Sequence, residues 1–231
     1  MDFWKITLDL LNGFSSSVFL FIFTLILSLP LGLLMCMGSI SKFPPLKWFM
    51  KIVILVLRGT PLMLQIFAIF YVPGLLTGGA FKWPVLATGW VWFDKTFSTR
   101  FIAALVAFSF NYAAYFSEIF RGGIQSVPKG QFEAGEVLCM SKSEIFFKII
   151  LKQTIKRILP SMSNEVITLV KDTSLANVIA VAELMFVAQK QLTSNGLIWP
   201  IFYAGLFYLL FNALVTFVMQ RLEKKLDYIK V

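Results

Sequence analysis

The sequence predicts an all-α integral membrane protein with five transmembrane helices, and three observations lead to this fold class. Hydrophobic residues make up 58% of the 231 residues and charged residues only 14%, which gives a mean hydropathy of +0.79. A soluble domain of this length cannot bury so much apolar surface, so the bilayer is the expected solvent. The apolar residues form five long runs, with most basic residues between alternate runs. We therefore expect one transmembrane domain over residues 1–231.

The first and last predicted spans are the simplest. The first runs from Phe14 to Ser39, long enough for a hydrocarbon core of about 30 Å. The segment before it carries Asp2 and Asp9 against Lys5. It lacks the basic head of a signal peptide, so we expect it to be retained. The last span, Leu197 to Met219, has few polar residues and is expected to be the most lipid-exposed.

The second predicted span, Trp48 to Val72, is interrupted by Arg58-Gly59-Thr60-Pro61. Arg58 lies about 15 Å along the helix from Trp48 and therefore near the middle of the bilayer. Pro61 cannot donate a hydrogen bond to the carbonyl of Leu57, so we expect a kink beside this charge. A buried charge needs a partner. Either Glu118 or Asp172 pairs with Arg58 structurally, or Arg58 faces the carboxylate of a substrate.

The third and fourth predicted spans carry polar faces. The third runs from Thr99 to Phe120, and its Asn111, Tyr115 and Glu118 share one face at spacings of i, i+4 and i+7. The fourth runs from Met162 to Val187. About half of its circumference is polar, through Asn164, Glu165, Thr168, Lys171, Asp172 and Ser174. Such a face cannot lie against lipid, so it must contact protein or a wet cavity.

These polar positions are candidates to line a substrate pathway. The set is Arg58, Thr60, Gln65, Asn111, Tyr115, Glu118, Lys171, Asp172 and Ser174. Two alternatives stay open. The polar residues of the third span can instead hold helices together. Lys171 and Asp172 can form an internal contact, although neighbours point about 100° apart on a helix and are expected to have separate partners.

Basic residues predict the orientation. Fourteen lysines and arginines lie at positions 42–51, 121–157 and 221–230, against five on the opposite side. The positive-inside rule then places the N-terminus outside and the C-terminus in the cytoplasm. The segment Pro73 to Ser98, with Trp83, Trp90 and Trp92, becomes an external loop or short interfacial helix, its tryptophans at the level of the lipid headgroups.

About forty residues, 121–160, form a long cytoplasmic loop in this orientation. Pro128 predicts the start of a short helix that ends near Leu138. A helix this short needs a surface to pack on, such as a groove on a partner. Ser141 to Glu144 reads as a capping box that begins a second helix. Along that helix, lysines at positions 148, 152 and 156 form a stripe suited to lipid headgroups.

The segment from Tyr115 to Ser141 resembles the conserved cytoplasmic loop of ATP-binding-cassette (ABC) importer permeases, whose signature is Glu-Ala-Ala, three residues, then Gly. Other stretches are similar to the polar amino acid uptake branch, the histidine, glutamine and arginine type. These are Tyr112 to Ser126, Arg58-Gly59-Thr60-Pro61-Leu62, Asn164-Glu165 and Lys171-Asp172-Thr173-Ser174-Leu175. The resemblance covers nearly the whole chain.

The resemblance implies a type I ABC importer permease fold and a permease subunit that moves an amino acid across the bacterial inner membrane. The implied partners are a second permease subunit, a separate ATPase, an extracytoplasmic amino-acid-binding protein and membrane lipid. The ATPase contact would be formed by Gly130, Glu133, Ala134, Gly135, Glu136, Leu138 and Cys139. From the residues alone, Glu133 and Glu136 could equally form a solvated helix face.

Three residues depart from the family pattern. Gly135 stands at the second alanine of the signature, Cys139 at its glycine, and Lys152 where a proline is usual. Glycine weakens a helix, and cysteine does not readily adopt a left-handed turn, so the turn geometry is open. Without a proline, the second helix is expected to run on unbroken through Lys152.

The sequence argues against several other functions. It contains no phosphate-binding loop of the form Gly-x-x-x-x-Gly-Lys-Ser/Thr, so the chain is not expected to hydrolyse ATP, and ATP and Mg²⁺ are expected on a partner. It has no histidine and no metal-ligand spacing. The net charge of +9 fits topology better than nucleic acid binding. Cys36 and Cys139 both fall on the reducing side, so no disulfide is implied. A stand-alone secondary transporter or channel remains the alternative.

Overall fold

The computed structural model describes residues 3–84 and 96–226, and every regular element in these ranges is helical. The elements in chain order are α1 (Phe3–Ser39), α2 (Pro44–Gly59), α3 (Leu62–Leu76), α5 (Thr99–Gln125), α6 (Gly130–Val137), α7 (Lys142–Glu144), η1 (Ile145–Ile150), α8 (Leu151–Asp172), η2 (Thr173–Ile179), α9 (Leu184–Asn195) and α10 (Trp199–Leu226). The tryptophans predicted to be interfacial at positions 90 and 92 lie outside the described residues.

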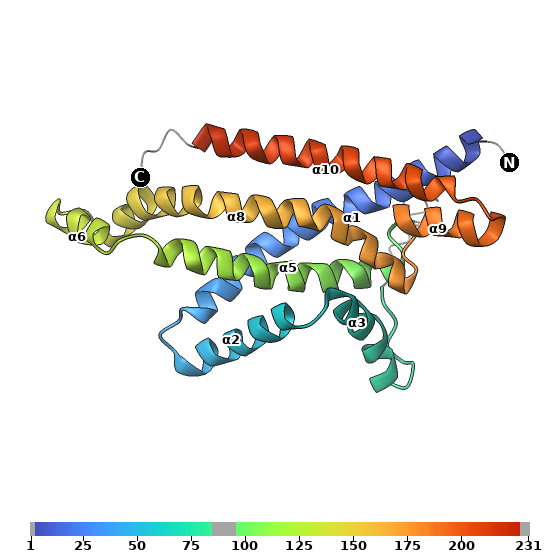
Figure 1. Cartoon of the computed structure of the whole chain (residues 1–231). Helices are drawn as coiled ribbons and strands as arrows, with labels where there is room; N and C mark the ends of the chain where they lie inside the picture. Colours follow the sequence, from blue (N-terminus) through green and yellow to red (C-terminus); the bar gives the residue numbers. More distant parts are fainter. Residues whose placement is uncertain (1–2, 85–95, 227–231) are drawn as a thin grey trace.

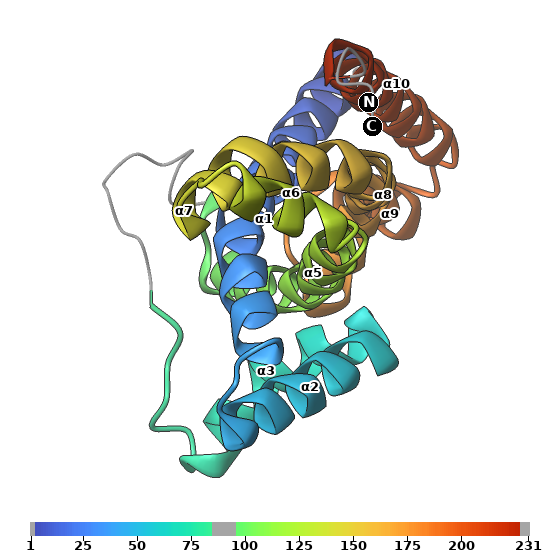
Figure 2. The same cartoon turned by 90° about the vertical axis from the view of Figure 1, so that its left-hand side faces the viewer.

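Helix α5 is the centre of the bundle. It contacts α1, α2, α3, α8 and η2. Figure 2 shows α2 and α3 on one side of the group formed by α1, α5 and α8, and α10 on the opposite side. In its most apolar stretch α5 is 61% buried, against 11% for α10. Among the described helices that are long and apolar enough to cross a membrane, α10 is therefore the most exposed, as predicted.

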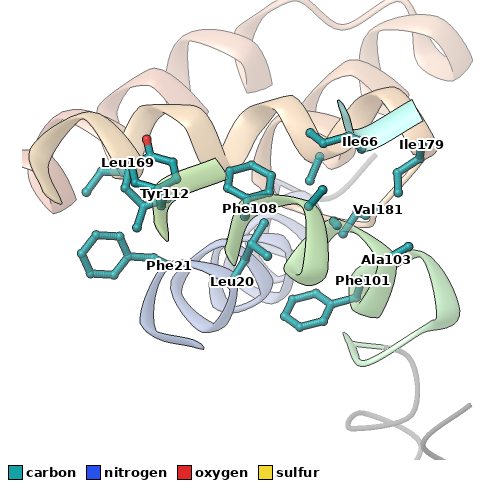
Figure 3. Close-up of a cluster of buried hydrophobic side chains, with 14 of the residues drawn as sticks. Leu20, Phe21, Ile66, Phe101, Ala103, Phe108, Tyr112, Leu169, Ile179 and Val181 are labelled. Carbon is teal, nitrogen blue, oxygen red and sulfur yellow. The ribbon is translucent and has the colours of Figure 1, made fainter. Parts of the chain in front are cut away.

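The main core forms where α1, α3, α5, α8 and η2 meet. Figure 3 shows Leu20 and Phe21 of α1 beside Phe108 and Tyr112 of α5, with Leu169 of α8 adjoining them. A smaller cluster joins the early part of α1 to α9 and α10 through Ile6, Leu10, Leu184, Ala188 and Ala204. This packing explains why α1 begins at Phe3, well before the predicted span at Phe14.

Length and apolarity alone do not confirm the predicted count of five spans. Within residues 3–84 and 96–226, the helices α1, α5 and α10 are long and apolar enough to cross a membrane. The second predicted span is two helices, α2 and α3, bent by 110° around Thr60-Pro61. The predicted kink is therefore a complete break. Counting this pair as one broken span gives four.

The fourth predicted span, Met162 to Val187, is wrong in both bounds. The helix is already formed at Lys142 and continues through α7, η1 and α8 to Asp172. It tightens to the 3₁₀ form of η2 and stops at Ala180, which is left-handed with φ 56°. Glu183 then begins α9, its side chain accepting hydrogen bonds from the amides of Met185 and Phe186. An acidic N-cap inside the apolar run separates the two helices.

The segment 121–160 is mostly helical. Helix α5 extends past its predicted end at Phe120 to Gln125. The predicted short helix is α6, and the capping box of Ser141 and Glu144 is confirmed. The following helix passes through Lys152 unbroken, as expected, but it is widened to a π-helix just before, over η1. In Figure 1, α6 lies at the same end of the bundle as the α1–α2 turn and the C-terminal end of α10.

The turn after α6 has a left-handed residue at the position of the family's glycine. Cys139 has φ 54°. Its amide donates to the carbonyl of Glu136, at 2.9 Å, and the amide of Met140 donates to the carbonyl of Gly135, at 3.1 Å. This pair of bonds is the Schellman motif, in which the left-handed position favours glycine. The departure at residue 139 therefore leaves the turn intact and adds backbone strain.

Gly123 is predicted to be essential for the contact between α5 and α8. A Cβ at Gly123 would come within 2.1 Å of Ile158 Cγ2, whereas a Cβ at the neighbouring Gly122 meets nothing within 4 Å. Gly123→Ala should therefore destabilise the protein by about 1–3 kcal/mol through overpacking. Gly122→Ala is the matched control and should be neutral or slightly stabilising, because alanine favours a helix. Thermal unfolding of both purified variants tests this, and equal midpoints would contradict the close packing.

Replacing Cys139 by glycine should relieve the strain of the left-handed turn. We expect Cys139→Gly to stabilise the α6–α7 turn by about 0.5–1 kcal/mol, since the strain relieved exceeds the added backbone entropy. Cys139→Ala keeps a Cβ and should give no gain. Hydrogen exchange of the Met140 amide, followed by mass spectrometry, reports the stability of the turn. Faster exchange in the glycine variant would refute the assignment.

Candidate functional site

Two adjoining cavities meet at Arg58, between the end of α2, the second half of α5 and α8. The first has a volume of about 530 Å³, and its polar lining is formed by Ser39, Lys51, Arg58, Tyr115, Glu118 and Arg121. The second, of about 580 Å³, shares Arg58, Tyr115 and Glu118 with the first and adds Ser126, Arg157 and Glu165. The sequence-predicted residues Arg58, Tyr115 and Glu118 are therefore brought together on one wall.

On this wall, two guanidinium groups, those of Arg58 and Arg121, lie beside one carboxylate, that of Glu118. Glu118 is held chiefly by Arg121, whose Nε lies 3.0 Å from Oε1 and whose Nη2 lies 2.5 Å from Oε2. Arg58 Nη1 is 3.7 Å from the same Oε2. The guanidinium of Arg58 also stacks on Tyr115, 5.2 Å from the ring centroid, and its side chain is 42% exposed. Arg58 is the weaker partner of a carboxylate that is already satisfied, so its donors can take a second anion.

Thr60, Gln65 and Asn111 lie together, but they serve the break between α2 and α3. Pro61 leaves the carbonyl of Leu57 without its helical donor. Gln65 Nε2 donates to this oxygen at 2.7 Å, and Asn111 Nδ2 donates to it at 3.0 Å. Gln65 also bonds Thr60 Oγ1 at 2.8 Å and Asn111 at 3.1 Å. Gln65 and Asn111 are buried here, and neither lines the two cavities at Arg58.

The predicted polar residues at the end of α8 and the start of η2 have different partners. Asp172 accepts a hydrogen bond of 2.7 Å from the hydroxyl of Tyr112, which fixes α8 to α5. Lys171 is exposed, and the hydroxyl of Ser174 donates to the carbonyl of Lys171 at 2.8 Å. Asp172 thus has a partner separate from Lys171, as predicted. Of the residues on this polar face, Glu165 is the one that lines the cavity at Arg58.

Helix α6 presents the predicted contact residues to solvent. Gly130, Glu133, Ala134, Glu136, Leu138 and Cys139 are exposed, with Val137 and Leu138 uncovered by 82% and 71%. Gly135 alone of the predicted set is buried, and a Cβ there would come within 2.6 Å of Ile145 Cγ1. Alanine at this position would therefore collide with η1, which gives a physical reason for the departure at residue 135.

The start of the following helix is firmly capped. Glu144 accepts hydrogen bonds from Lys148 Nζ at 2.7 Å and from the Ser141 amide at 3.1 Å. These donors stabilise the charged carboxylate, Lys148 most strongly, and lower the pKa of Glu144 to about 2. The capping box therefore stays ionised at any physiological pH.

The candidate pathway set omitted four charged residues that line the cavities, although Glu165 was on the predicted polar face of the fourth span: Lys51, Arg121, Arg157 and Glu165. Arg121 carried a usable signal, because it follows Glu118 by three residues on one helix face. Lys51 and Arg157 carried no such signal, because each was attributed to the basic loops. In residues 3–84 and 96–226 no group of side chains suited to a metal ion is found. The site that remains is a pair of polar cavities with an arginine available for an anion.

Comparison with known proteins gives relatives along the whole chain. An L-cystine transport system permease protein of Bacillus subtilis (strain 168) is 36% identical over 228 residues, which cover 98% of this chain and 88% of the relative. An octopine transport system permease protein of Rhizobium radiobacter is 33% identical and covers 95% of this chain and 86% of the relative. An arginine ABC transporter permease protein of Escherichia coli (strain K12) is 34% identical and covers 94% of both chains.

Solved structures agree with this assignment. A chain from a crystal structure of an amino acid ABC transporter superimposes with a TM-score of 0.80 at 26% identity, covering 97% of this chain and 99% of that one. An inward-facing methionine ABC transporter gives a TM-score of 0.68 at 13% identity, over 98% and 99% of the two chains, and shares the fold. The family model for the binding-protein-dependent transport system inner membrane component matches residues 28–228. The chain belongs to this family of ABC importer permeases.

Proposed function

We propose that this chain is the membrane-spanning subunit of an importer that carries an amino acid inward across the bacterial cytoplasmic membrane, driven by ATP hydrolysis in a separate subunit. The five-span arrangement, with the N-terminus outside, belongs to this proposal. The observation that carries it is α6, a short helix at the end of the bundle whose predicted contact residues, apart from Gly135, are exposed (Figure 1).

The ATPase subunit is proposed to bind at α6. A helix of eight residues is marginal by itself. The exposed apolar residues Phe132, Val137 and Leu138, beside Glu133 and Glu136, give it the character of a helix that docks in a groove. ATP and Mg²⁺ are assigned to the ATPase, so this chain carries no cofactor and performs no catalysis. Rocking of the helices then opens the cavity near Arg58 to alternate sides.

An α-amino acid is the proposed cargo because of the charges at the cavity. The relatives are permeases for cystine, octopine and arginine, and each of these molecules carries a carboxylate. Arg58 offers a guanidinium for that group, and Glu165, which lines the same cavity, offers a carboxylate for an ammonium.

The remaining partners follow from the family and from the exposed surfaces. We assign a second permease subunit, an amino-acid-binding protein at the outer face, and lipid along the lysines at positions 148, 152 and 156. The stand-alone transporter or channel is not carried forward, because the family is one of binding-protein-dependent transport.

Arg58→Gln should lower uptake about 10–100-fold, the loss expected when a charge-assisted hydrogen bond of about 1.5–3 kcal/mol to a carboxylate is removed. The assay is uptake of a labelled amino acid by the complete complex in proteoliposomes. Arg221→Gln is the matched control, since Arg221 stacks on Phe217 of α10, outside the cavities. Full uptake by the Arg58 variant would remove this residue from the pathway.

Glu133→Arg should disrupt ATPase docking, because it reverses a charge at the exposed first turn of α6. We expect less ATPase to co-purify with the permease and uptake-coupled ATP hydrolysis to fall at least tenfold. The isosteric Glu133→Gln should have a milder effect. If the arginine variant retained full coupled activity, docking at α6 would be disproved.

A further inference from the structure

The segment between α5 and α6 is fastened to α8 at both of its ends. At one end, Arg157 Nη1 donates a hydrogen bond to the carbonyl oxygen of Ser126, the C-cap of α5. At the other end, Gln153 Nε2 donates to Gln131 Oε1, in the first turn of α6, at 3.0 Å. Gln153 and Arg157 are four residues apart and therefore share one face of α8. We call these two hydrogen bonds the α8 clamp.

Apolar packing holds the middle of the same segment. Val127 is buried with Ile145 and Ile150 of η1. Gly135 of α6 packs on Ile145 so closely that no side chain fits between them. Helix α6 is therefore seated on the helix that runs through η1 into α8, and Figure 1 shows it beyond the end of that helix.

Packing alone does not account for a glutamine at position 153. Its Nε2 is engaged in the clamp, but its Oε1 is buried and finds no hydrogen-bond partner within residues 3–84 and 96–226. A buried carbonyl oxygen without a donor destabilises a fold. Leucine has a similar size and avoids this cost. Gln153 is therefore less favourable for stability than leucine would be. What it contributes is the hydrogen bond to Gln131.

The clamp leads directly to the cavity. Arg157 and Ser126 line the same cavity of about 580 Å³ as Arg58, Glu118 and Glu165. Arg157 and Glu165 both lie on α8, on either side of Pro160. A displacement of α6 that the clamp transmits to α8 therefore moves Glu165 relative to Arg58, which stands on α2.

We propose that Gln153 and Arg157 are positioning residues that make α6 and α8 move as one body. This inference rests on the proposed function, because it needs an ATPase that moves α6. Without the clamp, α6 still docks, but its movement is absorbed by the connecting segment and reaches the cavity incompletely. ATP is then hydrolysed with little transport.

The test compares Gln153→Leu and Arg157→Met with the wild type in the complete complex of permease, ATPase and binding protein in nanodiscs and proteoliposomes. The readouts are co-purified ATPase, ATP hydrolysis with and without loaded binding protein, amino acid transported per ATP, and the unfolding midpoint. We expect unchanged ATPase binding, at least a fivefold fall in transport per ATP, and an unfolding midpoint for Gln153→Leu equal to or above that of the wild type.

Conservative and compensating variants serve as controls. Arg157→Lys keeps a cation within reach of the Ser126 carbonyl and should retain more than half of the coupling. The double variant Gln131→Glu with Gln153→Lys replaces the amide bond by an ion pair and should restore transport per ATP to within twofold. Normal coupling in Gln153→Leu and Arg157→Met, or no recovery in the double variant, overturns the clamp. If the wild-type complex shows no ATP-driven uptake, the proposed function fails instead.

Discussion

The carbonyl oxygen of Leu57 is the point on which the site depends. Thr60-Pro61 ends α2, and in a membrane the freed oxygen must find a donor within the protein. Gln65 from α3 and Asn111 from α5 both donate to it. These bonds fix the 110° bend between α2 and α3. They also place the end of α2 against α5, where the next residue, Arg58, meets Glu118 and Tyr115.

The position of Arg58 then produces a charge imbalance. One carboxylate, Glu118, faces two guanidiniums, and the nearer Arg121 takes it with two hydrogen bonds. A residual positive charge in this cavity attracts an anion. Structural pairing and ligand binding at Arg58 are therefore not exclusive. Under the proposed function, a substrate carboxylate takes the place of the loose contact of 3.7 Å between Arg58 and Glu118.

The sequence predicts what depends on local chemistry and fails where tertiary contacts decide. The capping box at Ser141, the interruption at Pro61 and the short helix α6 were predictable, because each is encoded within a few residues. The bend of 110° was not, since it depends on Asn111, which is 46 residues from Gln65. The end of the fourth helix was missed because the apolar run continues through Ala180 to Val187. Only the acidic cap at Glu183 marks the break.

The family signature alone could not explain Gly135 and Cys139, because their surroundings also depend on tertiary contacts. At Gly135 the available space is set by Ile145 of η1, and η1 is a widened turn next to Lys152, where the family usually has proline. Proline at residue 152 would free a carbonyl and bend the helix there, whereas here the helix continues through Lys152 into α8 and has its proline further on, at Pro160. A continuous helix transmits displacement along its axis better than a hinged one. The departures at residues 135 and 152 therefore lie on packed, continuous segments: Gly135 of α6 packs on η1, η1 continues through Lys152 into α8, and α8 carries Glu165 to the cavity that Arg58 also lines.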